Sequence, residues 1–206
     1  MAEPPITRGF RGKRPSAPAN RVPPGQHLTT DFPVLSAGPT PPTDLTAWRF
    51  ALKNTDGGVL REWSWTEFAA LPQTEIKVDI HCVTTWTKLD TQWRGVTIDA
   101  LLEAAGLPEA PLPYAMIHCE GGYTTNVPLA DMRGGKAMIA THYEGKPLAP
   151  AHGGPARLLV PHLYFWKSAK WARALQFMTQ DAPGFWEQLG YHIYGDPWRE
   201  QRYAGD

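Results

Sequence analysis

Residues 78–86 read Val78-Asp79-Ile80-His81-Cys82-Val83-Thr84-Thr85-Trp86, and they place one of only two cysteines where a strand passes into a polar, aromatic turn. Side chains alternate between the two faces of a strand, so Val78, Ile80 and Cys82 share one face. The thiol therefore points where the apolar side chains point. A cysteine in such a place is most often a small, inert core residue. Other features of the chain decide whether it is a metal ligand instead.

The composition describes one folded domain with balanced charge. The chain has 206 residues and 42% hydrophobic content, enough for one sizeable core. Lysine plus arginine equals aspartate plus glutamate at 20 each, which gives no reason to expect nucleic acid or a membrane surface as partner. No stretch approaches the roughly 20 apolar residues of a membrane span. Two cysteines are too few for a disulfide framework, so we expect a reducing, cytoplasmic location.

The first residues differ in composition from the rest. Residues 1–44 hold ten of the 21 prolines and show little periodicity. Residues 1–25 are therefore predicted to form an extended arm. From Gln26 onward, apolar anchors such as Phe32 are mixed with hydrogen-bonding side chains, and we place the folded domain at residues 26–206.

The periodicity of the remaining chain predicts the α+β class with a mixed sheet. A β-hairpin is expected between Trp48 and Trp63, followed by a short helix with Ser64 and Glu67 at capping-box spacing. After the polar turn that follows Cys82, a second helix is expected at residues 98–105. Further strands are predicted at residues 77–82, 114–119, 137–141, 157–160 and 171–177, and a loop at residues 121–126.

The tripeptide Ile-His-Cys occurs twice, at residues 80–82 and 117–119, which suggests a zinc site of two histidines and two cysteines. Adjacent side chains of a strand point to opposite faces, so His81 and Cys82 do not readily ligate one ion, nor do His118 and Cys119. A disulfide between Cys82 and Cys119 needs paired strands and an oxidising compartment. Neither alternative is favoured over the core thiol.

A local positive charge lies in the second half of the chain. Residues 145–180 contain no acidic residue but five basic ones: Lys146, Arg157, Lys167, Lys170 and Arg173. A solvated basic face is the common meaning of such a run. Here the cations are interleaved with apolar residues, and an unpaired buried charge is costly, which favours a bound anion. Lys167-Ser168-Ala169-Lys170 suits a phosphate monoester, and the His152-to-Arg157 loop ends on a guanidinium suited to a bidentate contact.

Taken in order, these segments resemble the molybdenum-cofactor domain of the sulfite oxidase family, in its small bacterial branch. The resemblance runs from about Gln26 to the end of the chain. It is carried by the following motifs: Cys82, Trp93-x-Gly95-Val96, Leu101-Leu102-Glu103, Glu120-Gly121-Gly122-Tyr123, His152-Gly-x-Pro155-x-Arg157, Lys167-Ser168-x-Lys170-Trp171, Gly184-Phe185-Trp186-Glu187 and Gly195-Asp196-Pro197-Trp198.

The resemblance implies a cofactor of one molybdenum and one molybdopterin, with the Cys82 thiolate as the one protein ligand to the metal. It assigns pterin or phosphate contacts to the following residues: Phe32, Cys119, His152, Arg157, Lys167, Ser168 and Lys170. His118 and Tyr123 are expected at the substrate mouth, where packed core roles are the alternative.

The implied activity is oxygen-atom transfer on a small oxyanion or sulfur compound, of sulfite or sulfoxide type. Sulfite-oxidising members carry additional arginines around the substrate, and Lys167 stands in the place of one of them. The resemblance also implies an external electron-transfer partner such as a cytochrome. The alternative from a different class is a non-catalytic anion- or cofactor-binding protein in which Cys82 is a buried core thiol.

Overall fold

The computed structural model describes residues 20–108 and 112–206. It contains eleven strands and three short α-helices in this part of the chain. In order, the elements are β1 (His27–Leu28), β2 (Arg49–Lys53), β3 (Val59–Ser64), α1 (Trp65–Ala69), β4 (Thr74–His81), β5 (Trp86–Thr97), α2 (Ile98–Ala104), β6 (Tyr114–Cys119), β7 (Thr124–Pro128), β8 (Met138–Tyr143), β9 (Lys146–Pro147), β10 (Arg157–Leu159), β11 (Ala172–Met178) and α3 (Phe185–Gln188).

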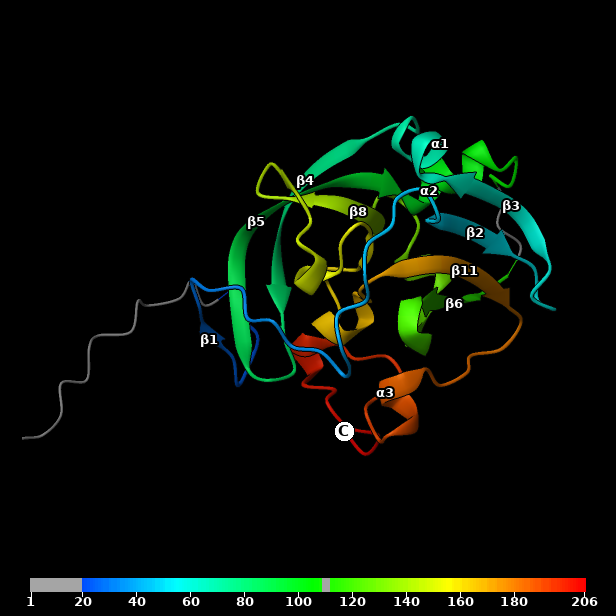
Figure 1. Cartoon of the computed structure of the whole chain (residues 1–206). Helices are drawn as coiled ribbons and strands as arrows, with labels where there is room; N and C mark the ends of the chain where they lie inside the picture. Colours follow the sequence, from blue (N-terminus) through cyan, green and yellow to red (C-terminus); the bar gives the residue numbers. More distant parts are fainter. Residues whose placement is uncertain (1–19, 109–111) are drawn as a thin grey trace, which may run out of the picture.

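Two mixed sheets form the domain, which confirms the α+β class (Figure 1). The first sheet runs β1-β5-β8-β10, with β4 beside β5 and β9 beside β8. The second runs β3-β2-β11-β6-β7. Each sheet has one parallel pair, β1 with β5 and β11 with β2, among antiparallel ones. A parallel bridge between His81 and Tyr164 joins the end of β4 to the segment that follows β10.

Two apolar clusters form the core. The larger cluster joins the two sheets: it contains Phe50 and Ile117 of the second sheet, Ile139 and Leu158 of the first, and Leu101 of α2. The smaller one lies on the first sheet and contains Ile80, Cys82, Trp86, Trp93, Met138, Ala140, Leu148 and Leu159. Cys82 therefore packs into the smaller cluster, while Cys119 packs into the larger one.

Local signals in the sequence explain both longer helices. Ser64 caps α1 with a complete capping box: its hydroxyl accepts from the Glu67 amide and the Glu67 side chain accepts from the Ser64 amide. Thr97 caps α2 in the same position. The predicted hairpin, both helices and the predicted strands are all present.

Two strands depart from the prediction. The polar segment after Cys82 becomes β5, the longest strand, because β4 on one side and β8 on the other satisfy its backbone groups. Residues 124–128 form β7 beside β6, although the two glycines before them predict a loop. The proposed arm at residues 1–25 lies mostly outside the described residues, and its last part is tied down, since Arg21 forms an ion pair with Asp79.

No helix among residues 20–108 and 112–206 has the length and apolar character needed to cross a membrane.

Candidate active site

Cys82 opens the tight turn that joins β4 to β5. The Cys82 amide donates to the Trp86 carbonyl at 2.8 Å, and the Thr85 amide donates back to the Cys82 carbonyl at 3.0 Å. Thr85 adopts a left-handed conformation with φ of 72°, which is uncommon for a threonine and fixes the direction of the turn. These bonds hold the thiol-bearing residue rigidly at the end of the strand.

The sulfur of Cys82 is buried and faces hydrogen-bond donors. The residue is 6% exposed and its thiol is free. The Thr84 hydroxyl donates to Sγ at 3.2 Å. Burial raises the pKa of the thiol, whereas the Thr84 bond and the positive charge of Arg202 oppose that rise. The net pKa of the thiol stays above its ordinary value, so the Thr84 hydroxyl and Arg202 supply only part of what a thiolate needs. A bound metal ion would supply the rest.

Segments from both ends of the chain hold the same turn. From the N-terminal side, the Gln26 amide group donates to the Cys82 carbonyl at 3.1 Å. From the C-terminal side, Arg202 Nη1 donates to the Val83 carbonyl at 2.8 Å. The N-terminal segment also pairs with the sheet as β1, next to β5 at the left edge of the molecule (Figure 1). Sequence reasoning missed Gln26, Thr84 and Arg202, because no local pattern relates them to the thiol.

Arg157 is a buried cation with no carboxylate against it among the described residues. It is 1% exposed. It donates to the carbonyl oxygens of His152, at 2.8 Å, and of Ser168. Its guanidinium lies 4.2 Å from the ring centre of Phe165. Burial lowers the pKa of Arg157 to about 9, a sign that its charge lacks full compensation by the protein.

Lys170 extends this positive charge, and the His152 ring lies beside it. The Lys170 ammonium donates to the carbonyls of Leu35, at 2.6 Å, and Ala151, at 2.7 Å. Burial and the Arg157 charge lower the pKa of Lys170 to about 8. Burial, Arg157 and Lys170 lower the pKa of His152, which favours the neutral ring, and its buried Nδ1 has no partner among the described residues. We call Arg157 and Lys170, together with the neutral His152 ring beside them, the cation cluster.

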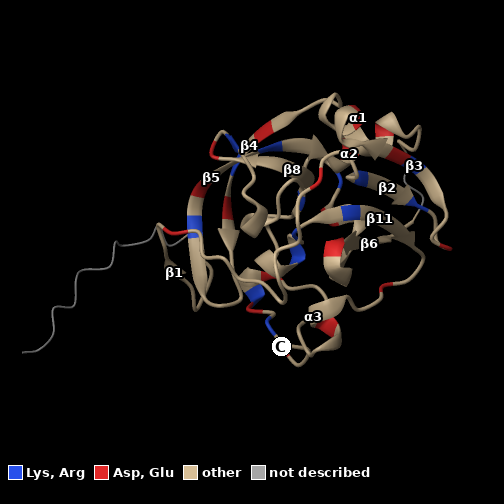
Figure 2. Ribbon diagram, viewed as in Figure 1, with Lys and Arg blue, Asp and Glu red and all other residues tan. Residues whose placement is uncertain are grey.

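The loop geometry brings the cation cluster together. Gly153 has a φ of +105°, and a Cβ there would lie 3.0 Å from the Lys170 backbone. Only glycine allows this close approach without displacing a neighbour. Figure 2 shows basic segments in the loops between β8 and β11, in the middle of the molecule, whereas basic and acidic residues are interspersed on the outer strands.

Phe32 links the cation cluster to the thiol turn. Its ring stacks on His152 with centres 4.0 Å apart and planes 10° apart. It also meets Trp86, the residue that closes the Cys82 turn, with ring centres 6.4 Å apart. The remaining rings around it are Trp93, Tyr143 and Phe165. Phe32 and His152, which the resemblance assigns separately to the cofactor, therefore lie against each other.

Ser168 and Lys167 are both engaged inside the protein. The Ser168 hydroxyl accepts from the Val160 amide at 2.9 Å. The Lys167 ammonium, fully buried, forms an ion pair with Glu187 at 2.6 Å. It also donates to the Asn126 side chain at 2.8 Å and the Ile193 carbonyl at 2.7 Å. All three protons of Lys167 are therefore directed at protein oxygens.

Three predicted residues lie away from the thiol turn. Cys119 is buried in the larger core, where burial raises the pKa of its thiol and Arg157 opposes the rise. Tyr123 donates to the Trp166 carbonyl at 2.8 Å, and burial raises the pKa of its hydroxyl far above the usual value. His118 points to the opposite face of β6 from Cys119, where its ring bonds the Gln176 side chain at 2.9 Å. The structure does not bring His118 to the other candidate residues.

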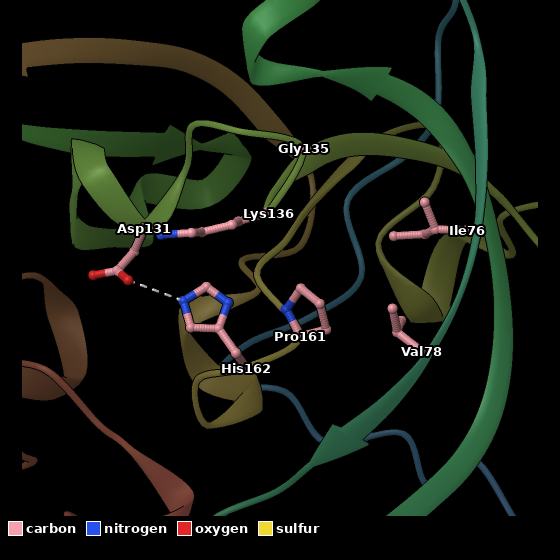
Figure 3. Close-up of a pocket in the computed structure, with 7 residues that line it drawn as sticks. All are labelled: Ile76, Val78, Asp131, Gly135, Lys136, Pro161 and His162. Carbon is pink, nitrogen blue, oxygen red and sulfur yellow. Dashed lines mark hydrogen bonds and ion pairs between the residues drawn. The ribbon is translucent and has the colours of Figure 1, made fainter.

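A separate cavity of about 390 Å³ lies beside β4 (Figure 3). Ile76 and Val78 form one wall, on the same strand face as Cys82, and the His162 ring reaches toward Asp131 at 3.2 Å on the other side. Fully buried Ile80 stands between these residues and Cys82 along the strand. The cavity is therefore not the space in front of the thiol.

Comparison with protein families identifies the chain. The model of the oxidoreductase molybdopterin-binding domain matches residues 37–186. This chain belongs to that family. It is a molybdopterin-binding oxidoreductase of the sulfite oxidase type, and the family cofactor is molybdenum-molybdopterin.

Individual relatives agree with this assignment. The uncharacterized oxidoreductase YuiH of Bacillus subtilis is 45% identical over 199 residues, which cover 96% of this chain and 99% of YuiH. Human mitochondrial sulfite oxidase is 23% identical over 208 residues, covering 84% of this chain and 38% of that enzyme. The crystal structure of the sulfane dehydrogenase SoxCD from Paracoccus pantotrophus shares the fold, with a TM-score of 0.58 at 18% identity over 68% of this chain and 40% of that one.

The residues of the site fit this cofactor. The described residues gather no group of three or more His, Cys, Asp or Glu side chains that could hold a metal ion. A single soft thiolate suits a metal whose remaining ligands come from the cofactor itself. Within residues 20–108 and 112–206, no carboxylate pairs with the cation cluster, and the buried His152 Nδ1 has no hydrogen-bond partner. An anionic, hydrogen-bonding pterin would satisfy both deficits.

Proposed function

We propose that this oxidoreductase transfers an oxygen atom to or from a small sulfur compound or oxyanion, with Cys82 as the one protein ligand to molybdenum. The observation that carries the proposal is the Cys82 turn, in which a buried sulfur accepts from Thr84 at 3.2 Å beside the positive charge of Arg202. When bound, the cofactor supplies the oxidation–reduction chemistry that side chains alone do not have. The chain supplies the thiolate, the counter-charge and the dry surroundings.

The cation cluster is proposed to hold the anionic end of the pterin cofactor. Lys170 is the best placed for a phosphate, since it is partly exposed and its present partners are two neutral carbonyls. Arg157 adds positive charge from its buried position, although its own N–H groups donate to backbone carbonyls. His152 contributes its free ring nitrogen, and Phe32 covers the His152 ring. Ser168 and Cys119 then act by supporting Arg157 rather than by a direct charge.

The buried ion pair of Lys167 favours a neutral sulfur compound of sulfoxide type over sulfite. In sulfite-oxidising relatives an arginine stands in the place of Lys167 and contributes positive charge for the anionic substrate. Here Glu187 cancels the charge of Lys167 at 2.6 Å, and Asn126 and Ile193 take its remaining donors. Lys167 therefore adds little to the binding energy of an anionic substrate, and the binding of a neutral substrate does not depend on its charge.

Two further properties are proposed, an external electron-transfer partner and a location in the cell. An external one-electron carrier such as a cytochrome is proposed to exchange electrons with the cofactor after each oxygen-atom transfer. Both cysteines are free thiols, which supports a reducing compartment, and we propose the cytoplasm.

Metal analysis tests the proposal. Protein produced in a host that makes molybdopterin should contain about one molybdenum per chain, because one thiolate holds one metal. Cys82→Ser should remove the Mo(V) paramagnetic signal or alter it greatly. Lys170→Glu should lower the molybdenum content by repelling the phosphate. The matched control is Lys146→Glu, an exposed lysine of the same acid-free segment, which should retain the metal.

Wild-type protein without molybdenum would overturn the proposal. So would a Cys82→Ser variant with normal metal content and an unchanged Mo(V) signal. Equal metal loss in Lys170→Glu and Lys146→Glu would remove Lys170 from the cofactor site and leave Cys82 in place.

A further inference from the structure

The C-terminal segment delivers a cation to the thiol turn. This segment lies beyond residues 37–186, the part matched by the family model. Its backbone is fixed around Arg202: the Arg202 carbonyl accepts from the His192 amide at 3.1 Å, and the Arg202 amide donates to the Asp206 carboxylate at 2.8 Å. A bridge between Tyr191 and Tyr203 closes the same small loop. The position of Arg202 is thus built into the fold of the tail.

The side chain of Arg202 turns inward, toward the Cys82 turn. Nη1 donates to the Val83 carbonyl at 2.8 Å, and the guanidinium lies 5.2 Å from the ring centre of Tyr164. The side chain is 15% exposed. Its acidic neighbours are Glu200, 3.7 Å away and 51% exposed, and the exposed Asp206, so solvent screens both pairs. The guanidinium therefore has no buried carboxylate partner among the described residues, and its charge acts on the turn.

A cation near a metal-bound thiolate changes the electron affinity of the metal. Each electron added to the centre makes it more negative, and a fixed positive charge in a poorly solvated place stabilises the more negative state. This stabilisation depends on the charge of Arg202 and not on its hydrogen bond to the Val83 carbonyl.

We propose that Arg202 is a positioning residue that fixes the Val83 carbonyl of the Cys82 turn and, through its charge, raises the reduction potential of the molybdenum centre. The inference rests on the proposed ligation of molybdenum by Cys82. It assigns a role in the redox chemistry to a part of the chain that the family model does not cover.

The test compares Arg202→Met with Arg202→Lys in molybdenum-loaded protein. Reductive titration with dithionite, followed by the Mo(V) paramagnetic signal, gives the Mo(VI)/Mo(V) potential. Arg202→Met should lower the ratio of Mo(V) to Mo(VI) at a fixed potential by about tenfold, which is about 59 mV for one electron. Arg202→Lys keeps the charge and should stay within about threefold of wild type. The control, Arg199→Met, removes an exposed arginine of the same segment and should leave the potential unchanged.

A second measurement examines the hydrogen bond from Arg202 to the Val83 carbonyl. Hydrogen exchange of the Thr85 amide, which closes the turn on the Cys82 carbonyl, should accelerate in metal-free Arg202→Met. An unchanged exchange rate would remove the tie to Val83 from the proposal.

The outcomes separate this inference from the proposed function. Wild-type protein without molybdenum would overturn the proposed function. A wild type with molybdenum and an Arg202→Met variant with the same potential would overturn only the role of Arg202. Equal shifts in Arg202→Met and Arg202→Lys would also overturn it, because they would show a structural effect independent of charge. If the Arg202→Met protein folds but cannot retain molybdenum, Arg202 acts in holding the cofactor and not in setting its reduction potential, which would also overturn the proposal.

Discussion

The two Ile-His-Cys tripeptides have the same residues and opposite surroundings. Cys82 leaves β4 in a tight turn and accepts a hydrogen bond from the Thr84 hydroxyl. Cys119 ends β6 and packs in the larger core, with no side-chain hydrogen bond to its sulfur among the described residues. Each thiol has one cation near it, Arg202 for Cys82 and Arg157 for Cys119. The tripeptide therefore does not distinguish the two cysteines, whereas the turn that follows Cys82 does, and its donor supports the proposed role of Cys82 as the metal ligand.

Replacing each cysteine in turn gives the largest expected contrast. Changes to residues that only support a metal ligand typically cost 10- to 100-fold, so loss of the ligand in Cys82→Ala should cost more than about 100-fold in turnover. Cys119→Ala should retain molybdenum and turnover and lose about 1 to 2 kcal/mol of unfolding free energy, because it leaves a small cavity. Turnover with an artificial electron donor, metal content and urea unfolding measure these effects. Equal losses of turnover would end the distinction between the two thiols.

Arg157→Met tests how much the buried cation near Cys119 contributes to the stability of the fold. Its loss leaves the carbonyls of His152 and Ser168 without their donor, and we expect a cost of about 2 to 4 kcal/mol in unfolding free energy. The control is Arg173→Met, which breaks an exposed pair with Glu120 and should cost less than about 1 kcal/mol. Urea unfolding of the metal-free proteins compares them. Similar losses of unfolding free energy in the two variants would show that the burial of Arg157 gives it no greater contribution to stability than an exposed arginine has.

Lys170 makes the stability of the metal-free protein depend on pH. Its pKa is about 8 in the folded protein and about 10.4 in an unfolded chain. Between these values the unfolded state binds the extra proton, so folding gains stability as the pH rises. Lys170→Met lacks this dependence and should be more stable than wild type at pH 7 by about 1 kcal/mol, allowing for partial solvent exposure. The difference should shrink toward pH 10 in urea unfolding, and a difference that grows would contradict the assignment.

The histidines of the two tripeptides differ as their cysteines do, and the smallest effect of all is expected at His118. The buried His81 ring bonds the Thr87 hydroxyl at 2.9 Å, so His81→Ala should cost about 2 kcal/mol. The His118 ring bonds Gln176 in a partly exposed place, so His118→Ala should cost about 0.5 kcal/mol and leave the metal content unchanged. Thermal unfolding and metal analysis measure both. A loss of molybdenum in His118→Ala would return His118 to the site.

Local patterns predicted most of the fold. The caps of α1 and α2 and the alternation of β4, β6 and β11 are signals within a few residues, and all of them hold. β5 was missed because its pairing partners lie up to 50 residues away and polar residues dominate its first half, from Thr87 to Gln92. Strand formation there depends on neighbours that the local sequence does not specify.

Charge pairing between residues far apart in the chain could not be predicted from the sequence. The acid-free segment correctly indicated uncompensated cations at Arg157 and Lys170. It could not show that Lys167, in the same segment, turns away to Glu187 and loses its free charge. Arg202 was equally hidden, because 120 residues separate it from Cys82 and only the folded tail brings them together.

The two side chains that hold the Cys82 turn are made at different times during synthesis of the chain. Gln26 precedes Cys82, whereas Arg202 lies far beyond it in the sequence, and each bonds the backbone next to the same sulfur. A growing chain that has not yet reached Arg202 therefore presents Cys82 with its cover incomplete. With Cys82 as the proposed metal ligand, cofactor loading is expected only after Arg202 has been made and folded into place, and a chain cut before Arg202 would have a more open site.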